Sequence, residues 1–224
     1  MSNKIHYITV ATKPHPILKN IENRVLKQCE TIQILGLEEN RDIGWQGTGN
    51  FGVKLRYVYE FLKNPDILDN DIVLFTDAYD VIYCGNQKDI IDRFLELDKP
   101  IIFGAERLCN PDPQREGQYT FKSTEFPFLN SGLFIGWAWA LRICMMDYQY
   151  KDSDDDQRYW TTQFLEHSSF IGLDYDNKLF LNTADIDIND VIWNKDEGKA
   201  EYKGRLPKFV HINGPDKRDL MIFT

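Results

Sequence analysis

Short apolar runs with the composition of β-strands alternate with segments of helical spacing along most of this chain. Apolar residues that recur every three or four positions indicate helices, whereas short, fully apolar runs are typical of strands buried on both faces of a sheet. This alternation predicts an α/β fold with a mainly parallel sheet flanked by helices, and ligands are expected beyond the carboxyl ends of the strands. We expect strands over residues 5–11, 32–37, 72–75, 101–105, 133–135 and 209–212, helices over 17–26, 53–62, 89–97, 138–146 and 154–164, and irregular segments over 38–52 and 107–127.

The bulk properties favour one domain and argue against several classes of partner. A chain of 224 residues that is 42% hydrophobic can bury one sizeable core, so we expect one domain over residues 1–224. The formal net charge of −9, without a cluster of lysine and arginine, argues against a nucleic-acid or membrane-surface partner. No apolar run approaches the roughly 18 residues of a membrane span. Residues 1–13 lack the pattern of a secretory signal, so we expect a cytosol-like compartment.

Two aspartates stand where the apolar run 72–75 ends. Asp77 and Asp80 are three positions apart directly after this expected strand, a spacing that can place two carboxylates at the mouth of a cleft. Carboxylate oxygens suit Mg²⁺ or Mn²⁺, and diphosphate oxygens can complete the coordination shell. The alternative is an ordinary turn in which the aspartates cap backbone N–H groups.

The segment after the last expected strand carries a second set of reactive groups. His211 offers an imidazole that can be a third metal ligand, Gly214 permits close backbone approach, and Lys217 supplies a positive charge for a phosphate. The alternative is a histidine with a purely structural role. Because both segments follow strands that are expected to end at the same edge of the sheet, the two signals support each other.

A cluster of aspartates at residues 152–156 overlaps the start of the expected helix 154–164. Aspartates in the first turn of a helix accept hydrogen bonds from free N–H groups and interact with the helix dipole, at roughly 0.3–1 kcal/mol each. One aspartate would suffice for this purpose, and several close together repel one another. Asp155 and Asp156 are therefore candidates for binding a hydroxyl-rich or cationic acceptor, with helix capping as the alternative.

Three further side chains are candidates for contacts with a sugar or a base. Asn130 stands in a polar break before an apolar run, where its amide can orient a sugar hydroxyl or the segment can be merely a turn. Trp45 and Tyr79 can stack on a base or a sugar ring, or can simply cover the core.

Taken together, these segments resemble the glycosyltransferase domain of the procollagen lysyl hydroxylases, the collagen glucosyltransferase unit. The matching pieces stand in the family order over residues 40–217, and the ordered set is more specific than any single motif. They are Gly44-Trp45, Val53-Lys54-Leu55-Arg56, Phe75-Thr76-Asp77-Ala78-Tyr79-Asp80-Val81-Ile82, Ala105-Glu106, Phe128-Leu129-Asn130-Ser131-Gly132, Phe134-Ile135-Gly136, Tyr150-Lys151-Asp152, Asp154-Asp155-Asp156-Gln157, and His211 with Asn213-Gly214-Pro215 and Lys217.

The resemblance implies a GT-A-type nucleotide-sugar-binding fold and a metal-dependent transferase. The implied donor is UDP-glucose, the implied metal is Mn²⁺ or Mg²⁺, and the implied acceptor is galactosyl-hydroxylysine in collagen-like protein, with retention of the anomeric configuration. The residue roles that it implies are Asp77, Asp80 and His211 as metal ligands, Trp45, Lys54, Tyr79, Asn213, Gly214 and Lys217 around UDP, and Glu106, Asn130, Asp155 and Asp156 as catalytic candidates facing the sugar or acceptor.

Three positions depart from the family pattern. Asn110 follows Cys109 where the family has tryptophan, in a loop that covers the donor, and Leu133 and Ile212 replace family glycines. Two alternatives therefore stay open: a GT-A-like transferase for another UDP-sugar or acceptor, and a catalytically silent module that binds a UDP-sugar or collagen. The 224 residues leave no room for the hydroxylase domains of that family, so we expect no lysine hydroxylation from them.

Overall fold

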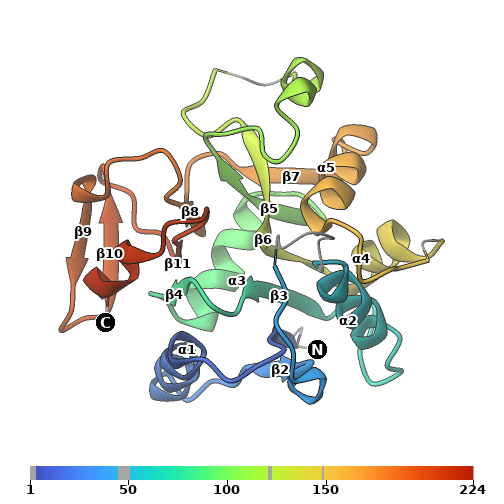
Figure 1. Cartoon of the computed structure of the whole chain (residues 1–224), viewed down its shortest axis with the longest axis horizontal. Helices are drawn as coiled ribbons and strands as arrows, with labels where there is room; N and C mark the ends of the chain where they lie inside the picture. Colours follow the sequence, from blue (N-terminus) through green and yellow to red (C-terminus); the bar gives the residue numbers. More distant parts are fainter. Residues whose placement is uncertain (1–3, 45–50, 121–122, 148, 224) are drawn as a thin grey trace.

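A six-stranded sheet in the order β2-β1-β3-β6-β5-β7 forms the centre of the molecule (Figure 1). The structure is a computed structural model that describes residues 4–44, 51–120, 123–147 and 149–223. Every strand of this sheet runs in the same direction except β6, which is antiparallel to both of its neighbours. The predicted mainly parallel α/β fold is therefore confirmed. The strands are β1 (Ile5–Val10), β2 (Gln33–Leu35), β3 (Ile72–Asp77), β5 (Ile101–Glu106), β6 (Phe128–Trp137) and β7 (Ile171–Asp174).

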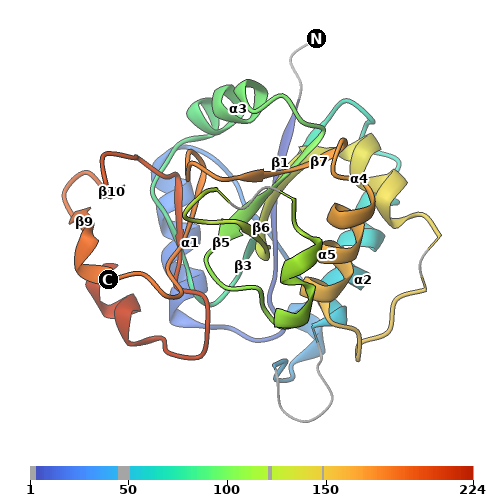
Figure 2. The same cartoon turned by 90° about the horizontal axis from the view of Figure 1, so that it is seen from above.

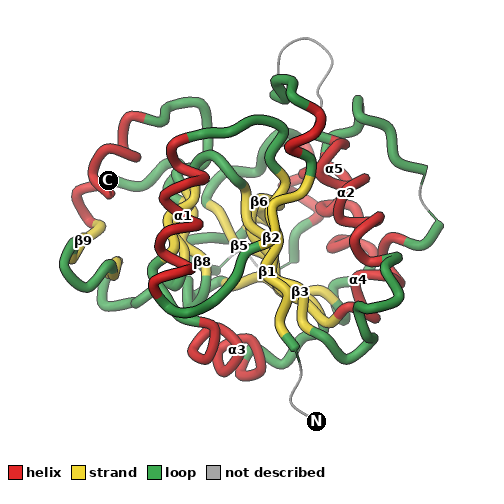
Figure 3. The backbone as a smooth tube through the Cα atoms, turned by 90° about the horizontal axis from the view of Figure 1, so that it is seen from below, coloured by secondary structure: helices red, strands yellow, loops and turns green. Residues whose placement is uncertain are grey.

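Helices cover the central sheet on both sides. Figure 3 shows α2, α4 and α5 on one side of the strands and α1 and α3 on the other. Trp160 of α5 packs on Phe103 and Phe134 of the sheet, with ring centroids 5.0 and 5.5 Å apart. Such apolar contacts are the main stabilising term for the layered arrangement. The helices are α1 (Pro16–Lys27), α2 (Gly52–Leu62), α3 (Gln87–Glu96), α4 (Ala138–Met145) and α5 (Asp156–Glu166).

A second, three-stranded sheet in the order β4-β11-β8 lies beside the central one. Its strands are β4 (Val81–Tyr83), β8 (Phe180–Asn182) and β11 (Phe209–His211), and a separate hairpin is formed by β9 (Val191–Asn194) and β10 (Lys199–Tyr202). Figure 2 shows this hairpin at the side of the molecule away from α2 and α4. Only β11 of these strands was expected from the sequence. Short 3₁₀ segments are η1 (Leu37–Glu39), η2 (Pro113–Gln118), η3 (Ile188–Asp190) and η4 (Arg218–Phe223).

Strand β6 is longer than the sequence indicated and contains an irregularity. Its register with β5 shifts from Phe103 opposite Phe134 to Gly104 opposite Asn130. Residues 131–133 therefore have no partner on β5, a larger irregularity than the single extra residue of an ordinary β-bulge. The turn considered for Asn130 is wrong, because this residue is buried inside the strand and paired with β5.

Within the described residues, no helix is both long and apolar enough to cross the hydrocarbon core of a membrane. The compartment expected from the first residues stays a prediction.

Candidate functional site

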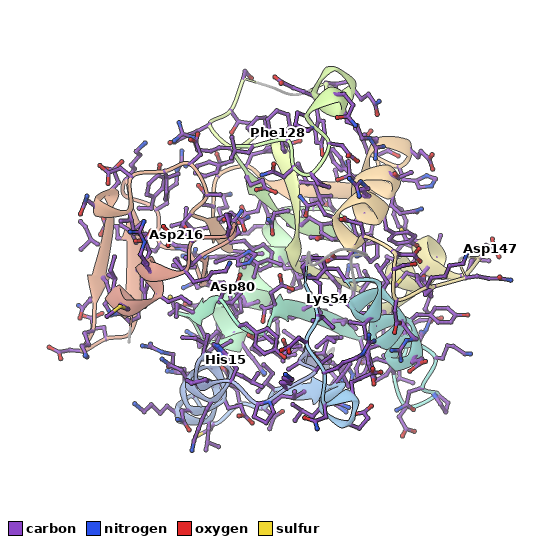
Figure 4. The ribbon with its side chains drawn as sticks, in the orientation of Figure 1. His15, Lys54, Asp80, Phe128, Asp147 and Asp216 are labelled. Atoms are coloured by element: carbon purple, nitrogen blue, oxygen red, sulfur yellow. The ribbon has the colours of Figure 1, made fainter. Side chains whose placement is uncertain are left out.

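A cleft of about 730 Å³ opens at one edge of the central sheet. Val10, Asp77 and Glu106, the last residues of three parallel strands, line it, so the cleft lies at the carboxyl ends where the strand order predicts ligand binding. Segments from β6, the start of α5 and the end of β11 complete its wall. In Figure 4, Lys54 and Asp80 both lie near the centre of the molecule, at this cleft.

Three predicted metal ligands converge at the cleft, although His211 is more than a hundred residues from the two aspartates along the chain. Asp77, Asp80 and His211 each offer a ligand atom, and these atoms all lie within 4.8 Å of one another. The Nε2 atom of His211 is 3.3 Å from Asp80 Oδ1 and 3.8 Å from Asp77 Oδ2. Two carboxylates and one imidazole form a donor set that suits Mn²⁺ and leaves positions for diphosphate oxygens.

Two residues to which the sequence analysis gave no role of their own fix the imidazole of His211. Asn182 Oδ1 lies 2.8 Å from His211 Nδ1 on the far side of the ring from the aspartates. Gly132 lies against the ring: a Cβ atom there would be 2.4 Å from His211 Cε1 and 2.8 Å from Asp77 Oδ2. Because real Cβ contacts are essentially never that short, any other residue at this position would force one of the two ligands or the strand to shift.

Lys54 is buried between two carboxylates. Its Nζ atom lies 2.9 Å from Asp77 Oδ1 and 2.8 Å from Asp156 Oδ2, so it connects a metal-ligand candidate to the acidic cluster. Burial opposes the charge, but Asp156 and Asp77 outweigh it and hold the pKa of the Lys54 amine above its ordinary value. The side chain that the resemblance assigned to UDP therefore lines the cleft while neutralising two acids.

The segment after β11 places a second lysine at the cleft. Lys217 Nζ donates to Asp80 Oδ2 at 2.5 Å and to the carbonyl of Ile212 at 2.6 Å. Gly214, with a backbone φ of 90°, allows the chain to turn between β11 and this lysine. Burial acts against ionisation of Asp80, but His211 and Lys217 outweigh it and hold the pKa of the carboxyl below its ordinary value.

Tyr79 presents its ring to the cleft while its hydroxyl is held by backbone groups. The hydroxyl oxygen accepts hydrogen bonds from the N–H groups of Thr12 and Lys13 at 2.8 and 3.0 Å. The ring thus has a fixed position at the cleft wall. Trp45, the other aromatic candidate, lies outside the described residues.

Glu106 is the centre of a buried polar network at the cleft. Its carboxylate accepts hydrogen bonds from Asn130 Nδ2 at 3.1 Å, Gln157 Nε2 at 2.8 Å and Asn213 Nδ2 at 2.9 Å. Burial raises the pKa of Glu106 to about 8. Gln157 also accepts from the Ser131 N–H at 2.7 Å, which anchors the irregular part of β6. The network holds Asn130 and Asn213 at the cleft.

Each aspartate of the acidic cluster has its own partner, so the repulsion expected from the sequence is compensated. Asp152 pairs with two arginines, and Asp154 accepts from a backbone N–H of its own turn. Asp155 caps α5 by accepting from the Arg158 N–H at 2.9 Å. Asp156 lines the cleft, and burial raises its pKa in spite of the neighbouring amine. The two candidate acids thus have different surroundings.

The three departures from the family pattern also have different surroundings. Leu133 and Ile212 are buried side chains of the hydrophobic core. Asn110 lines the cleft, and its carbonyl accepts from Gln157 Nε2 at 3.2 Å. Only Asn110 therefore adds a polar side chain to the cleft wall.

Comparison with known proteins identifies a family over the whole chain. The model of the family described as PLOD GT domain matches residues 1–224. The chain is 30% identical over 224 residues to procollagen-lysine,2-oxoglutarate 5-dioxygenase 1 of Bos taurus, covering 95% of this chain and 30% of that protein. It is 30% identical over 214 residues to the multifunctional procollagen lysine hydroxylase and glycosyltransferase LH3 of Homo sapiens, covering 88% of this chain and 28% of that protein. The chain thus spans just under a third of the length of the curated relatives it matches.

A solved structure supports the fold. The glycosyltransferase involved in the glycosylation of the major capsid of PBCV-1 matches this chain with a TM-score of 0.54, at 12% identity and over 98% of both chains. At this identity the likeness concerns the fold alone. The GT-A-type fold implied by the sequence resemblance is confirmed.

Proposed function

We propose a function from one premise: this chain belongs to the PLOD GT domain family and is a glycosyltransferase domain with a GT-A-type fold. In our proposal, residues 1–224 act as one metal-dependent domain that transfers glucose from UDP-glucose to galactosyl-hydroxylysine of a collagen-like protein, with retention. The observation that carries it is the Asp77, Asp80 and His211 cluster in a cleft that also holds Lys217. The name of the human relative, which combines a procollagen lysine hydroxylase and a glycosyltransferase, supports the choice of acceptor.

The metal would be held by Asp77, Asp80 and His211. Their convergence within 4.8 Å, and the absence of a Cβ at Gly132 between two of them, fit a divalent ion with oxygen and nitrogen ligands. Mn²⁺ suits this donor set, and Mg²⁺ is the second choice. When bound, the ion would neutralise negative charge on the two phosphates of the donor.

The nucleotide would lie between Tyr79 and the segment after β11. Tyr79 offers a fixed ring for stacking, and Gly214 allows close approach of the backbone to a phosphate. Lys217 would exchange its contact with Asp80 for a diphosphate oxygen and stabilise the charge that develops on the leaving group. At the nucleotide end of the cleft, Lys54 would neutralise the charge of Asp77, and Glu106 would orient the amide of Asn213. A role for Trp45 stays a prediction.

The acceptor would enter on the side of Glu106, Asn130 and Asp156. In the transfer, the bond between the anomeric carbon and the diphosphate oxygen breaks, and a bond from that carbon to the acceptor hydroxyl oxygen forms. We assign the hydroxyl proton to Asp156, the member of the acidic cluster that lines the cleft. Asn130 would orient a sugar hydroxyl. The catalytic role of Asp155 stays a prediction, since its carboxylate caps α5.

The test is transfer to a galactosyl-hydroxylysine collagen peptide, followed by mass spectrometry of the peptide and by release of UDP. Transfer from UDP-glucose should require Mn²⁺ and should be lost in Asp77→Ala, which removes one ligand. The matched control is Asp66→Ala, an exposed aspartate in the loop after α2. Undiminished transfer after exhaustive chelation would remove the metal from the proposal. Transfer of a different sugar, or to a different acceptor, would favour another transferase, and UDP binding without turnover would favour a silent module.

A further inference from the structure

The imidazole of His211 and the amide of Asn182 are neighbours because of how their strands pair. In the parallel pair β8 and β11, Asn182 is the direct register partner of His211. Both residues are buried, with exposed fractions of 0% for Asn182 and 3% for His211. Their contact, from His211 Nδ1 to Asn182 Oδ1 at 2.8 Å, joins the ring on β11 to the neighbouring strand β8.

The orientation of the Asn182 amide follows from its other contact. Its Nδ2 atom donates to the carbonyl of Ala105 on β5 at 2.9 Å, and a carbonyl oxygen can only accept. The Oδ1 atom must therefore be the one that faces His211. Gly104 leaves room for this arrangement, because a Cβ atom there would lie 2.8 Å from Asn182 Nδ2. The amide thus cannot turn over without losing its partner.

An amide oxygen that only accepts requires a donor on the histidine. Nδ1 must therefore carry a proton, which leaves Nε2 as the ring nitrogen that a metal can bind, 3.3 Å from Asp80 Oδ1 and 3.8 Å from Asp77 Oδ2. We propose that Asn182 is a positioning residue that keeps a proton on Nδ1 of His211 and so leaves Nε2 to face the two carboxylates. The inference deepens the proposed function and rests on it for the metal, but the proton on Nδ1 does not require a metal.

The first measurement is the protonation of His211 Nδ1 in the metal-free protein, by ¹⁵N NMR of the ring nitrogens. We expect a proton on Nδ1 in the wild type and an Nδ1 that is at least partly unprotonated in Asn182→Ala. An unprotonated Nδ1 in the wild type would overturn the proposal. This readout decides the proposal even if the wild-type protein binds no metal, in which case only the proposed function fails.

The second measurement is the affinity for Mn²⁺ alone, by calorimetry. Groups that orient a metal ligand typically contribute about 10–100-fold in affinity, so Asn182→Ala should bind Mn²⁺ at least about tenfold more weakly. Asn182→Asp keeps an oxygen that accepts from Nδ1 but loses the donor to the Ala105 carbonyl, so it should recover only part of this loss. Equal affinities for wild type and Asn182→Ala would contradict the proposal.

A matched control separates positioning from general destabilisation. Asn177 is also fully buried, its Nδ2 donates to the carbonyl of Phe180, and its Oδ1 accepts from Arg205, but it does not line the cleft. Its φ of 50° makes Asn177→Ala at least as disruptive for folding. We expect a comparable drop in melting temperature but affinity for Mn²⁺ within about twofold of wild type. A loss of affinity as large as in Asn182→Ala would assign the effect to folding and overturn the proposal.

Discussion

Replacing Gly132 with alanine tests whether the candidate metal site requires strand β6 to lie directly against His211 and Asp77. The new Cβ would lie 2.4 Å from His211 Cε1 and 2.8 Å from Asp77 Oδ2. Carbon atoms in favourable contact are about 3.5–4.0 Å apart, so the ring or the strand must shift by roughly 1 Å. Metal–ligand distances tolerate only about 0.2 Å. The substitution should therefore misplace a ligand even if the fold relaxes around it.

The expected magnitudes follow from these distances. Overpacking of this kind costs about 1–3 kcal/mol of stability, and a misplaced ligand should weaken Mn²⁺ binding by at least about 10–100-fold. Calorimetry with Mn²⁺ and thermal unfolding of the metal-free protein measure the two effects separately. Gly117→Ala is the control, because nothing lies within 4 Å of a Cβ atom at that position. If Gly132→Ala binds Mn²⁺ as tightly as Gly117→Ala, the proposed site is wrong.

Further predictions concern the other charged groups of the cleft. Lys217→Ala should weaken UDP binding about 10–150-fold, since one charge-assisted contact contributes roughly 1.5–3 kcal/mol, and calorimetric affinity within about twofold of wild type would refute the assignment. Folded Glu106 holds its proton up to a pKa of about 8, whereas the unfolded chain releases it near 4.5. The free energy of unfolding should therefore fall by about 1.4 kcal/mol per pH unit as pH rises through this window, on the order of 4–5 kcal/mol in all. Urea unfolding at several pH values should show a flatter slope for Glu106→Gln, and an unchanged slope would exclude a retained proton. Asp155→Asn keeps a capping oxygen and should cost at most about 1 kcal/mol, with a smaller loss of transfer rate than Asp156→Asn; equal losses would place both acids at the acceptor.

The pattern of the sequence predicts the central layer well because continuous apolar runs dominate it. The expected strands at 5–11, 72–75 and 101–105 correspond to β1, β3 and β5. The short strands β4, β8, β9 and β10 have three or four residues each, too few for a period of two to stand out from chance. Strand β6 was recognised only in its apolar half, because the polar residues of its irregular part face the cleft and interrupt the pattern.

The sequence predicted the site residues whose side chains can bind a metal. It did not predict the residues that act only by their position beside those side chains. Asp77, Asp80 and His211 carry groups that bind metals, so the type and position of each suggested a role. Asn182 has a common side chain on a strand that the sequence did not reveal, and its role appears only from the register of β8 with β11. The polar break at residues 130–132 was noticed, but the contact of Gly132 with His211 depends on which strands converge.

The spacing of the two aspartates is a consequence of the chain passing from one sheet to the other. Asp77 ends β3 of the central sheet, and β4 of the small sheet begins directly after Asp80. The carbonyl of Asp80 accepts from the Ile212 N–H at 2.9 Å, which ties the connecting turn to the end of β11. The three candidate ligands therefore lie where the two sheets meet. A metal that binds only this arrangement must stabilise the folded chain by RT ln(1 + [L]/Kd), where [L] is the free metal concentration and Kd is its dissociation constant.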